Sequence, residues 1–221
     1  MADNRLGEVY SKVSTHLGTE KVEQGLKDLL LAAMRRAVEQ VGKLNGFLHN
    51  ESIKILIPEQ LQPVVKIAQK AKKQEKVDSF EESLNRAAER AVPSALEIFT
   101  TAIMSLRFDD IKAIWESPSH NGATEYLKEK CSGPLAAAFT PEVARAMEEN
   151  RCSKAYEKLT TRVPGVSKLT KDLNLETYTV EKALHGLFLV CAEKERAVRE
   201  NPEQRPNEIV QHLFNHLDSH T

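Results

Sequence analysis

The chain has 221 residues, of which 41% are hydrophobic and 29% are charged, a balance typical of a soluble globular protein and too apolar for a disordered one. Aromatic residues make up only 5%, which argues against base-stacking platforms. The net charge is −1, and basic and acidic residues are nearly balanced in each half of the chain, so neither half is predicted to bind nucleic acid. Three widely spaced cysteines form neither a zinc motif nor a disulfide framework.

The N-terminal segment, residues 1–18, lacks the apolar stretch of a secretion signal. No part of the chain approaches the ~18 consecutive apolar residues that a membrane span needs. We therefore expect a cytoplasmic protein without a membrane span. Residues 1–18 are expected to form at most a short helix, and residues 19–221 a single helical domain.

In the first half, apolar residues spaced three or four apart from Thr19 predict a helix that stops at Gly42. Residues 46–57 contain two short β-like runs around a polar turn, and Pro58 then opens a helix over about residues 59–71. The tetrapeptide at 79–82, Ser-Phe-Glu-Glu, has the pattern of a capping box. It predicts a helix to about Leu106 that bends near Pro93.

In the second half, the same kinds of sequence signal predict shorter helices. They cover residues from Asp109 or Asp110 to Trp115, 123–131, 140 to about 150 or as far as 159, 179–200 and about 206–217. A break at 132–134 and a polar connection over 162–176 separate them. We expect an all-α bundle of about seven to nine helices with at most one short β-hairpin. Helices 19–43, 79–105 and 179–200 are expected to form its core.

Sequence motifs for catalysis or cofactor binding are absent. The chain has no GxGxxG or Walker phosphate loop, no GxSxG elbow, no HExxH and no Glu-x-x-His pair, so no cofactor is specified. One weak metal pattern remains. His212, His216 and His220 follow at helical spacing and could chelate a transition metal, but they lie at the C-terminus, where helices fray.

Polar residues interrupt the apolar faces of the two longest predicted helices. Asn85 lies inside the stripe of helix 79–105 with Glu89 at its margin, and Glu195 takes an apolar position in helix 179–200. A buried carboxylate must be paired or must line a wet cavity. Glu195 is expected to contact an arginine, either Arg199 or Arg86. These residues form either a structural network or a ligand or catalytic site.

From about Gly25 to Phe214 the chain resembles the family catalogued as domain of unknown function 4197. The segments that carry the resemblance are Gly46-Phe47, Ile53-Lys54-Ile55 with Pro58, Asn85-Arg86-Ala87-Ala88-Glu89, Ala123-Thr124 with Tyr126, Phe139-Thr140-Pro141, Ala183-Leu184-His185-Gly186-Leu187-Phe188, and Glu195, Arg199, Asn201-Pro202 and Arg205. The resemblance implies a mostly helical domain and no established activity, cofactor or catalytic residue. His185 departs from the usually acidic residue of the family pattern, and bacterial members typically carry an export signal.

Two functional classes stay open from the sequence. The first is a non-enzymatic binding or scaffold protein that holds an apolar small molecule or a partner helix in a groove between helices. The alternative is a hydrolase or lyase that uses Glu89, Glu195 or His185 with Tyr126. Balanced charge and the absence of catalytic motifs favour the first class. Only the polar residues within apolar stripes favour the second.

Overall fold

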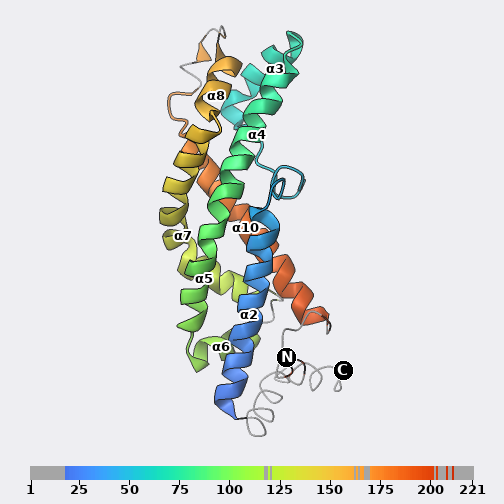
Figure 1. Ribbon diagram of the computed structural model, residues 1–221, viewed down its shortest axis with the longest axis vertical. Helices are drawn as coiled ribbons and strands as arrows, with labels where there is room; N and C mark the ends of the chain where they lie inside the picture. The colour runs from blue at the N-terminus through green and yellow to red at the C-terminus, as the bar shows by residue number, and fades with distance from the viewer. Residues whose placement is uncertain are drawn as a thin grey trace. The chain divides into compact units, whose positions relative to one another are not determined.

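The computed structural model describes residues 18–116, 119, 121–161, 163, 165–166, 170–201, 203, 208 and 211. Within these residues the chain forms helices and turns and no strand, which confirms the predicted all-α class (Figure 1). The elements, with η marking a single 3-10 turn, are α2 (Thr19–Gly42), η1 (Glu59–Leu61), α3 (Gln62–Lys70), α4 (Gln74–Ala91), η2 (Val92–Ser94), α5 (Ala95–Met104), α6 (Phe108–Glu116), α7 (Gly122–Glu149), α8 (Cys152–Thr160) and α10 (Leu175–Glu200).

The described residues fall into two compact units. Unit 1 takes its residues from the chain up to Val38, from Leu96–Gly133 and from Phe188 onward, and unit 2 from Glu39–Ala95 and Pro134–Leu187. Helices α2, α7 and α10 each contribute residues to both units. The single helical domain expected over residues 19–221 stays a prediction.

Helix α2 follows the apolar period of its sequence. Its residues spaced three or four apart are buried, among them Val22, Leu26, Leu29, Leu30, Ala33, Ala37 and Val41. The helix ends at Gly42, as predicted, and Asn45 then adopts a left-handed backbone with a φ of 67°. A Cβ at Gly46 would lie 2.4 Å from the carbonyl oxygen of Val41, so only glycine allows the chain to turn back so closely.

The two β-like runs predicted within residues 46–57 do not pair as strands, and this part of the prediction is wrong. Residues 44–49 and 51–53 form turns instead. The backbone groups that a hairpin would pair are bonded to side chains of α4: Glu89 accepts from the N–H of Phe47, and Asn85 bonds both the N–H and the carbonyl of Ile55. A β-rich composition was therefore overridden by hydrogen bonds to a neighbouring helix.

The helix predicted from Ser79 begins earlier, at Gln74, so the 79–82 capping box is not used. Val77 extends the buried stripe of Phe80 and Leu84 toward the N-terminus, and burial of this additional turn favours the longer helix. At Pro93 the α-helix is interrupted by the 3-10 turn η2 before α5 begins, and the bend expected there stays a prediction.

Helix α7 runs unbroken through the predicted break at 132–134, so the separate helices expected at 123–131 and 140–150 are one helix. The hydroxyl of Thr140 donates to the carbonyl of Ala136 and does not cap a new helix. An uninterrupted buried stripe explains the continuity: Cys131, Leu135, Phe139, Val143 and Ala146. Burial of its large side chains, at about 1.5–3 kcal/mol each, offsets the cost of Pro134 and Pro141, about 3 kcal/mol each.

Helix α10 begins at Leu175, four residues before the predicted start, where the Asn174 side chain accepts from the N–H of Thr177. The predicted core residues Leu84, Ala88, Phe99, Leu187, Phe188 and Cys191 are all buried. In unit 1 the rings of Phe99 and Phe188 meet edge to face, with centroids 5.9 Å apart.

Three predictions fall on residues outside the described part of the chain. They are the N-terminal segment 1–18 except for residue 18, the C-terminal helix over about 206–217 except for residues 208 and 211, and the histidines His212, His216 and His220. Among the helices that are described, none combines the length and the apolar character needed to cross a membrane.

Candidate functional site

Asn85 on α4 bonds the backbone of the loop over residues 43–57. Its amide oxygen accepts from the N–H of Ile55 at 2.8 Å, and its amide nitrogen donates to the Ile55 carbonyl and to the Glu81 carbonyl, each at 2.8 Å. The side chain is fully buried. Every polar atom of Asn85 is therefore satisfied by backbone groups of unit 2.

Glu89 holds the first part of the same loop. Its Oε1 accepts from the N–H groups of Phe47 at 3.1 Å and Leu48 at 3.2 Å, while Oε2 pairs with Arg86 at 2.7 Å. Arg86 also donates to the side-chain oxygen of Asn45. Burial is the largest single effect on the Arg86 guanidinium and lowers its pKa, but the hydrogen bonds and charges of Glu89 and Glu82 together outweigh burial, so the pKa is raised. The charge of the buried Glu89 carboxylate is thus paired with Arg86, and both of its oxygens accept hydrogen bonds.

Phe47 is the apolar anchor of this loop. Its ring is completely buried, and a Cβ at Gly186 on α10 would lie only 2.7 Å from Phe47 Cε1. Gly186 therefore provides the space for the ring. We call Asn85, Arg86, Glu89, Phe47 and Gly186 the loop anchor. It joins three of the segments that carry the family resemblance.

In unit 1, Glu195 caps the N-terminus of α7 from a different helix. Its carboxylate accepts from the N–H groups of Ala123 at 3.0 Å and Thr124 at 2.8 Å, and from the Thr124 hydroxyl at 2.7 Å. Arg199 donates to it through Nε at 3.1 Å and Nη2 at 2.7 Å. The predicted contact with an arginine is confirmed for Arg199, whereas Arg86 pairs with Glu82 and Glu89.

The cap places a negative charge where the helix dipole and free N–H groups favour one. Glu195 is 1% exposed, so the interaction is little screened by solvent. The arginine was predictable from its position four residues along α10. The backbone partners were not, because nothing in the sequence places the start of α7 beside the last turns of α10.

Two of the predicted candidates lie apart from these clusters. The Tyr126 hydroxyl donates to Asp110 at 3.3 Å, and burial, followed by the charge of Asp110, raises the pKa of the tyrosine. His185 is exposed on α10. No group of three or more histidine, cysteine or acidic side chains within the described residues could hold a metal ion.

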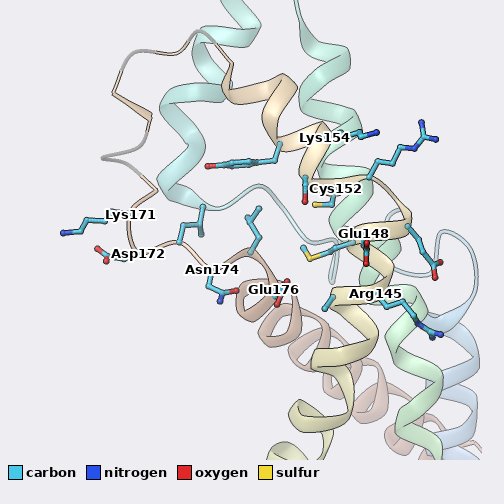
Figure 2. Close-up of a pocket in the computed structure, with 16 residues that line it drawn as sticks. Arg145, Glu148, Cys152, Lys154, Lys171, Asp172, Asn174 and Glu176 are labelled. Carbon is cyan, nitrogen blue, oxygen red and sulfur yellow. The ribbon is translucent and has the colours of Figure 1, made fainter.

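A cavity that the sequence did not predict lies in unit 2, between the end of α7, the start of α8 and the start of α10. Its volume is about 1280 Å³. Figure 2 shows Arg145 and Glu148 of α7 and Asn174 and Glu176 at the start of α10 around it, with Cys152 and Lys154 of α8 and with Lys171 and Asp172. We call this cavity the α8 groove.

The α8 groove lies where α7 ends at Glu149 and α8 begins at Cys152. Arg151 has a left-handed φ of 56°, an unusual conformation for a residue other than glycine. No sequence rule points to Arg151 as such a residue, which is why the groove was missed. Burial raises the pKa of the Cys152 thiol, and a hydrogen bond with Ser83 only partly opposes this effect. The thiol is therefore protonated near neutral pH and is a poor nucleophile.

Comparison with known proteins gives one family. Residues 16–215 match the family described as protein of unknown function (DUF4197). No curated protein and no solved structure matches the chain. The match spans nearly the whole sequence and includes every segment on which the resemblance rested. The chain therefore belongs to the DUF4197 family.

Proposed function

We propose that this protein is a non-enzymatic binding protein that holds a helical segment of a partner protein in the α8 groove. The observation that carries the proposal is the groove itself, with a volume of about 1280 Å³. Pockets for small molecules typically measure about 300–1,000 Å³ and are mostly apolar. The α8 groove is larger and is lined by many charged side chains, which favours a peptide over an apolar small molecule.

The charges around the groove support a partner that carries both signs. Four cationic and four anionic side chains line it: Arg145, Arg151, Lys154 and Lys171, and Glu148, Glu149, Asp172 and Glu176. Leu173 and Leu175 add half-buried apolar surface. An amphipathic helix with a few apolar anchors and mixed flanking charges would match this lining.

The alternative, a hydrolase or lyase, has weaker support. The carboxylates of Glu89 and Glu195 accept hydrogen bonds from backbone amides and arginines. Neither of them lines the α8 groove. The groove does contain the Cys152 thiol, whose pKa is raised by burial, the opposite of what an activated nucleophile requires.

A photo-crosslinking amino acid at Leu173 tests the proposal, with the same residue at Leu44 as the control. Leu173 lines the groove, whereas Leu44 is 72% exposed and lies outside it. Crosslinking in the source cells should give a discrete protein product from Leu173 only. A synthetic peptide of the crosslinked segment should then bind the purified protein and gain helicity.

Reversing a charge in the groove provides a second test of the proposed peptide binding. Lys171→Glu should weaken binding of that peptide about two- to fivefold at low salt, the effect of a charge at the rim of an interface. Lys21→Glu, an exposed reversal on α2, should leave binding unchanged. Equal crosslinking from Leu44, or a small molecule retained in native mass spectrometry of protein from its own source, would contradict the proposal.

A further inference from the structure

A lysine-rich surface covers α3 and the turn that joins it to α4 in unit 2. Residues 66–76 contain five lysines and one glutamate, in a chain whose net charge is −1. Lys66, Lys70, Lys72 and Lys73 are exposed, and none of them forms an ion pair with a residue that the structure describes. Lys76 is half-buried, and its amino group donates to the carbonyl of Lys158. We call the four exposed residues the lysine surface.

Helix α3 is amphipathic. Val64, Val65 and Ala68 are buried, and α3 packs with them against α4 and α8 (Figure 1). The opposite face carries Lys66 and Lys70, and Ile67 lies at the margin of that face, next to Lys70. Ile67 is 47% exposed. Helices that bind the interface of a lipid bilayer combine a lysine-rich face with apolar side chains that enter the headgroup region. In α3 the buried residues are already used by the protein, so Ile67 is the apolar side chain of this helix that can make such a contact.

The turn after α3 keeps a lysine where glycine is favoured. Lys72 has a φ of 55°, and the N–H groups of Lys72 and Lys73 bond the carbonyls of Gln69 and Ala68. This pattern is the Schellman motif, whose left-handed position is usually glycine. A lysine at this position is strained relative to glycine, so fold stability does not explain its presence. Attraction to the helix dipole explains Lys70 in the last turn of α3 but neither Lys66 nor the strain at Lys72.

We infer that the lysine surface binds the anionic surface of a phospholipid bilayer, with Ile67 inserted among the headgroups. Charge complementarity supplies the attraction, since each lysine near such a surface strengthens binding about fivefold. A nucleic acid is the less suitable partner, because residues 62–76 contain no arginine for bidentate phosphate contacts and no aromatic residue for base stacking. The inference does not depend on what the α8 groove binds.

Vesicle co-sedimentation of the purified full-length chain tests the inference. Vesicles of phosphatidylcholine with about 30% phosphatidylserine should bind the protein, and vesicles of phosphatidylcholine alone should not. Binding should weaken steeply as salt rises from about 0.1 M to 0.5 M, because the Debye length falls below the reach of the lysine charges. Absence of binding to the anionic vesicles at about 0.1 M salt would overturn the inference.

Matched reversals separate the lysine surface from overall charge. Lys66→Glu with Lys73→Glu should weaken binding to the anionic vesicles at least about 25-fold. Lys21→Glu with Lys128→Glu changes the net charge equally at exposed positions elsewhere and should change binding less than about twofold. Equal losses in the two double variants would show non-specific attraction and would overturn the inference.

Two single variants address folding and the kind of partner. Lys72→Gly should weaken vesicle binding about fivefold while the melting temperature stays the same or rises, so the loss cannot come from unfolding. Ile67→Ser should weaken vesicle binding about fivefold, whereas Leu44→Ser should not. Tighter binding to a duplex oligonucleotide than to the vesicles, unaffected by Ile67→Ser, would assign the lysine surface to nucleic acid and overturn the inference.

Discussion

Replacing Glu195 by glutamine tests whether the cap on α7 stabilises the fold. Glutamine keeps the shape but offers one acceptor oxygen. If that oxygen takes the place of Oε2, it keeps both bonds from Thr124. The amide nitrogen then faces the N–H of Ala123 and the Arg199 guanidinium, which are both donors. One buried N–H loses its acceptor and one charge-assisted pair is lost.

The expected loss is about 3 kcal/mol of unfolding free energy. An unsatisfied buried donor costs about 1–3 kcal/mol, and a hydrogen bond to a charged group contributes about 1.5–3 kcal/mol. Partial relaxation of Arg199, whose side chain is 10% exposed, keeps the sum toward the lower end. Urea denaturation followed by circular dichroism measures the loss, and native-state hydrogen exchange should show faster exchange at the Ala123 and Thr124 amides.

The matched control is Glu193→Gln, an exposed change two residues earlier on α10, which should shift stability by less than about 0.5 kcal/mol. A loss below about 1 kcal/mol for Glu195→Gln, with exchange at Ala123 and Thr124 unchanged, would refute the argument that the carboxylate holds the start of α7. Unchanged or increased stability combined with loss of a bound ligand would identify Glu195 as part of a binding site instead.

Three further predictions follow from buried contacts. Phe188→Ala should lower the unfolding free energy by about 3–5 kcal/mol, because the ring is 5% exposed and packs on Phe99; a loss below about 1 kcal/mol in urea would show that it is not core. Gly186→Ala should cost about 1–3 kcal/mol in the same assay, because the added methyl meets the Phe47 ring. Gly133→Ala, inside α7 with nothing within 4 Å of the added methyl, should leave stability unchanged or raise it by up to about 1 kcal/mol. Burial, then the charge of Glu195, raises the pKa of the Cys191 thiol from 9.0, so the native state keeps a proton that the unfolded chain releases. Above about pH 9 the protein should therefore lose stability more steeply than Cys191→Ala, approaching about 1.4 kcal/mol per pH unit, and parallel pH profiles would contradict this.

The sequence predicted the helices whose apolar period is strong and local. On α2, the stripe from Val22 to Val41 and the stop at Gly42 are both local features. The errors arose where a local signal competed with a tertiary one. Pro134 and Pro141 predict breaks in α7, but burial of the uninterrupted stripe from Cys131 to Ala146, whose helical spacing is also present in the sequence, keeps the helix continuous.

The residues of the candidate site could also be predicted only in part from the sequence. Asn85, Glu89 and Glu195 were identifiable because polar residues in apolar stripes are unusual, and the Glu195–Arg199 pair followed from helical spacing. Apart from the Glu81 carbonyl, four residues from Asn85, their backbone partners lie 30 to 72 residues away in the chain, and helical periodicity carries no information about contacts at that separation. The α8 groove depends on a left-handed residue, Arg151, that carries no sequence signature.

The residues that carry the family resemblance and the residues that line the α8 groove are different sets. Asn85, Arg86, Glu89 and Gly186 anchor the loop over residues 43–57, and Glu195 holds the start of α7. These contacts stabilise the fold. The polar side chains bond backbone groups that have no partner within their own segment, and Gly186 leaves room for the Phe47 ring. The lysine surface consists of exposed side chains, and the charged side chains that line the groove are exposed as well, so the fold does not require these particular residues. Membership of the family therefore argues for a common helical architecture, and it neither supports nor opposes the two proposed binding surfaces, which depend on other residues of this chain.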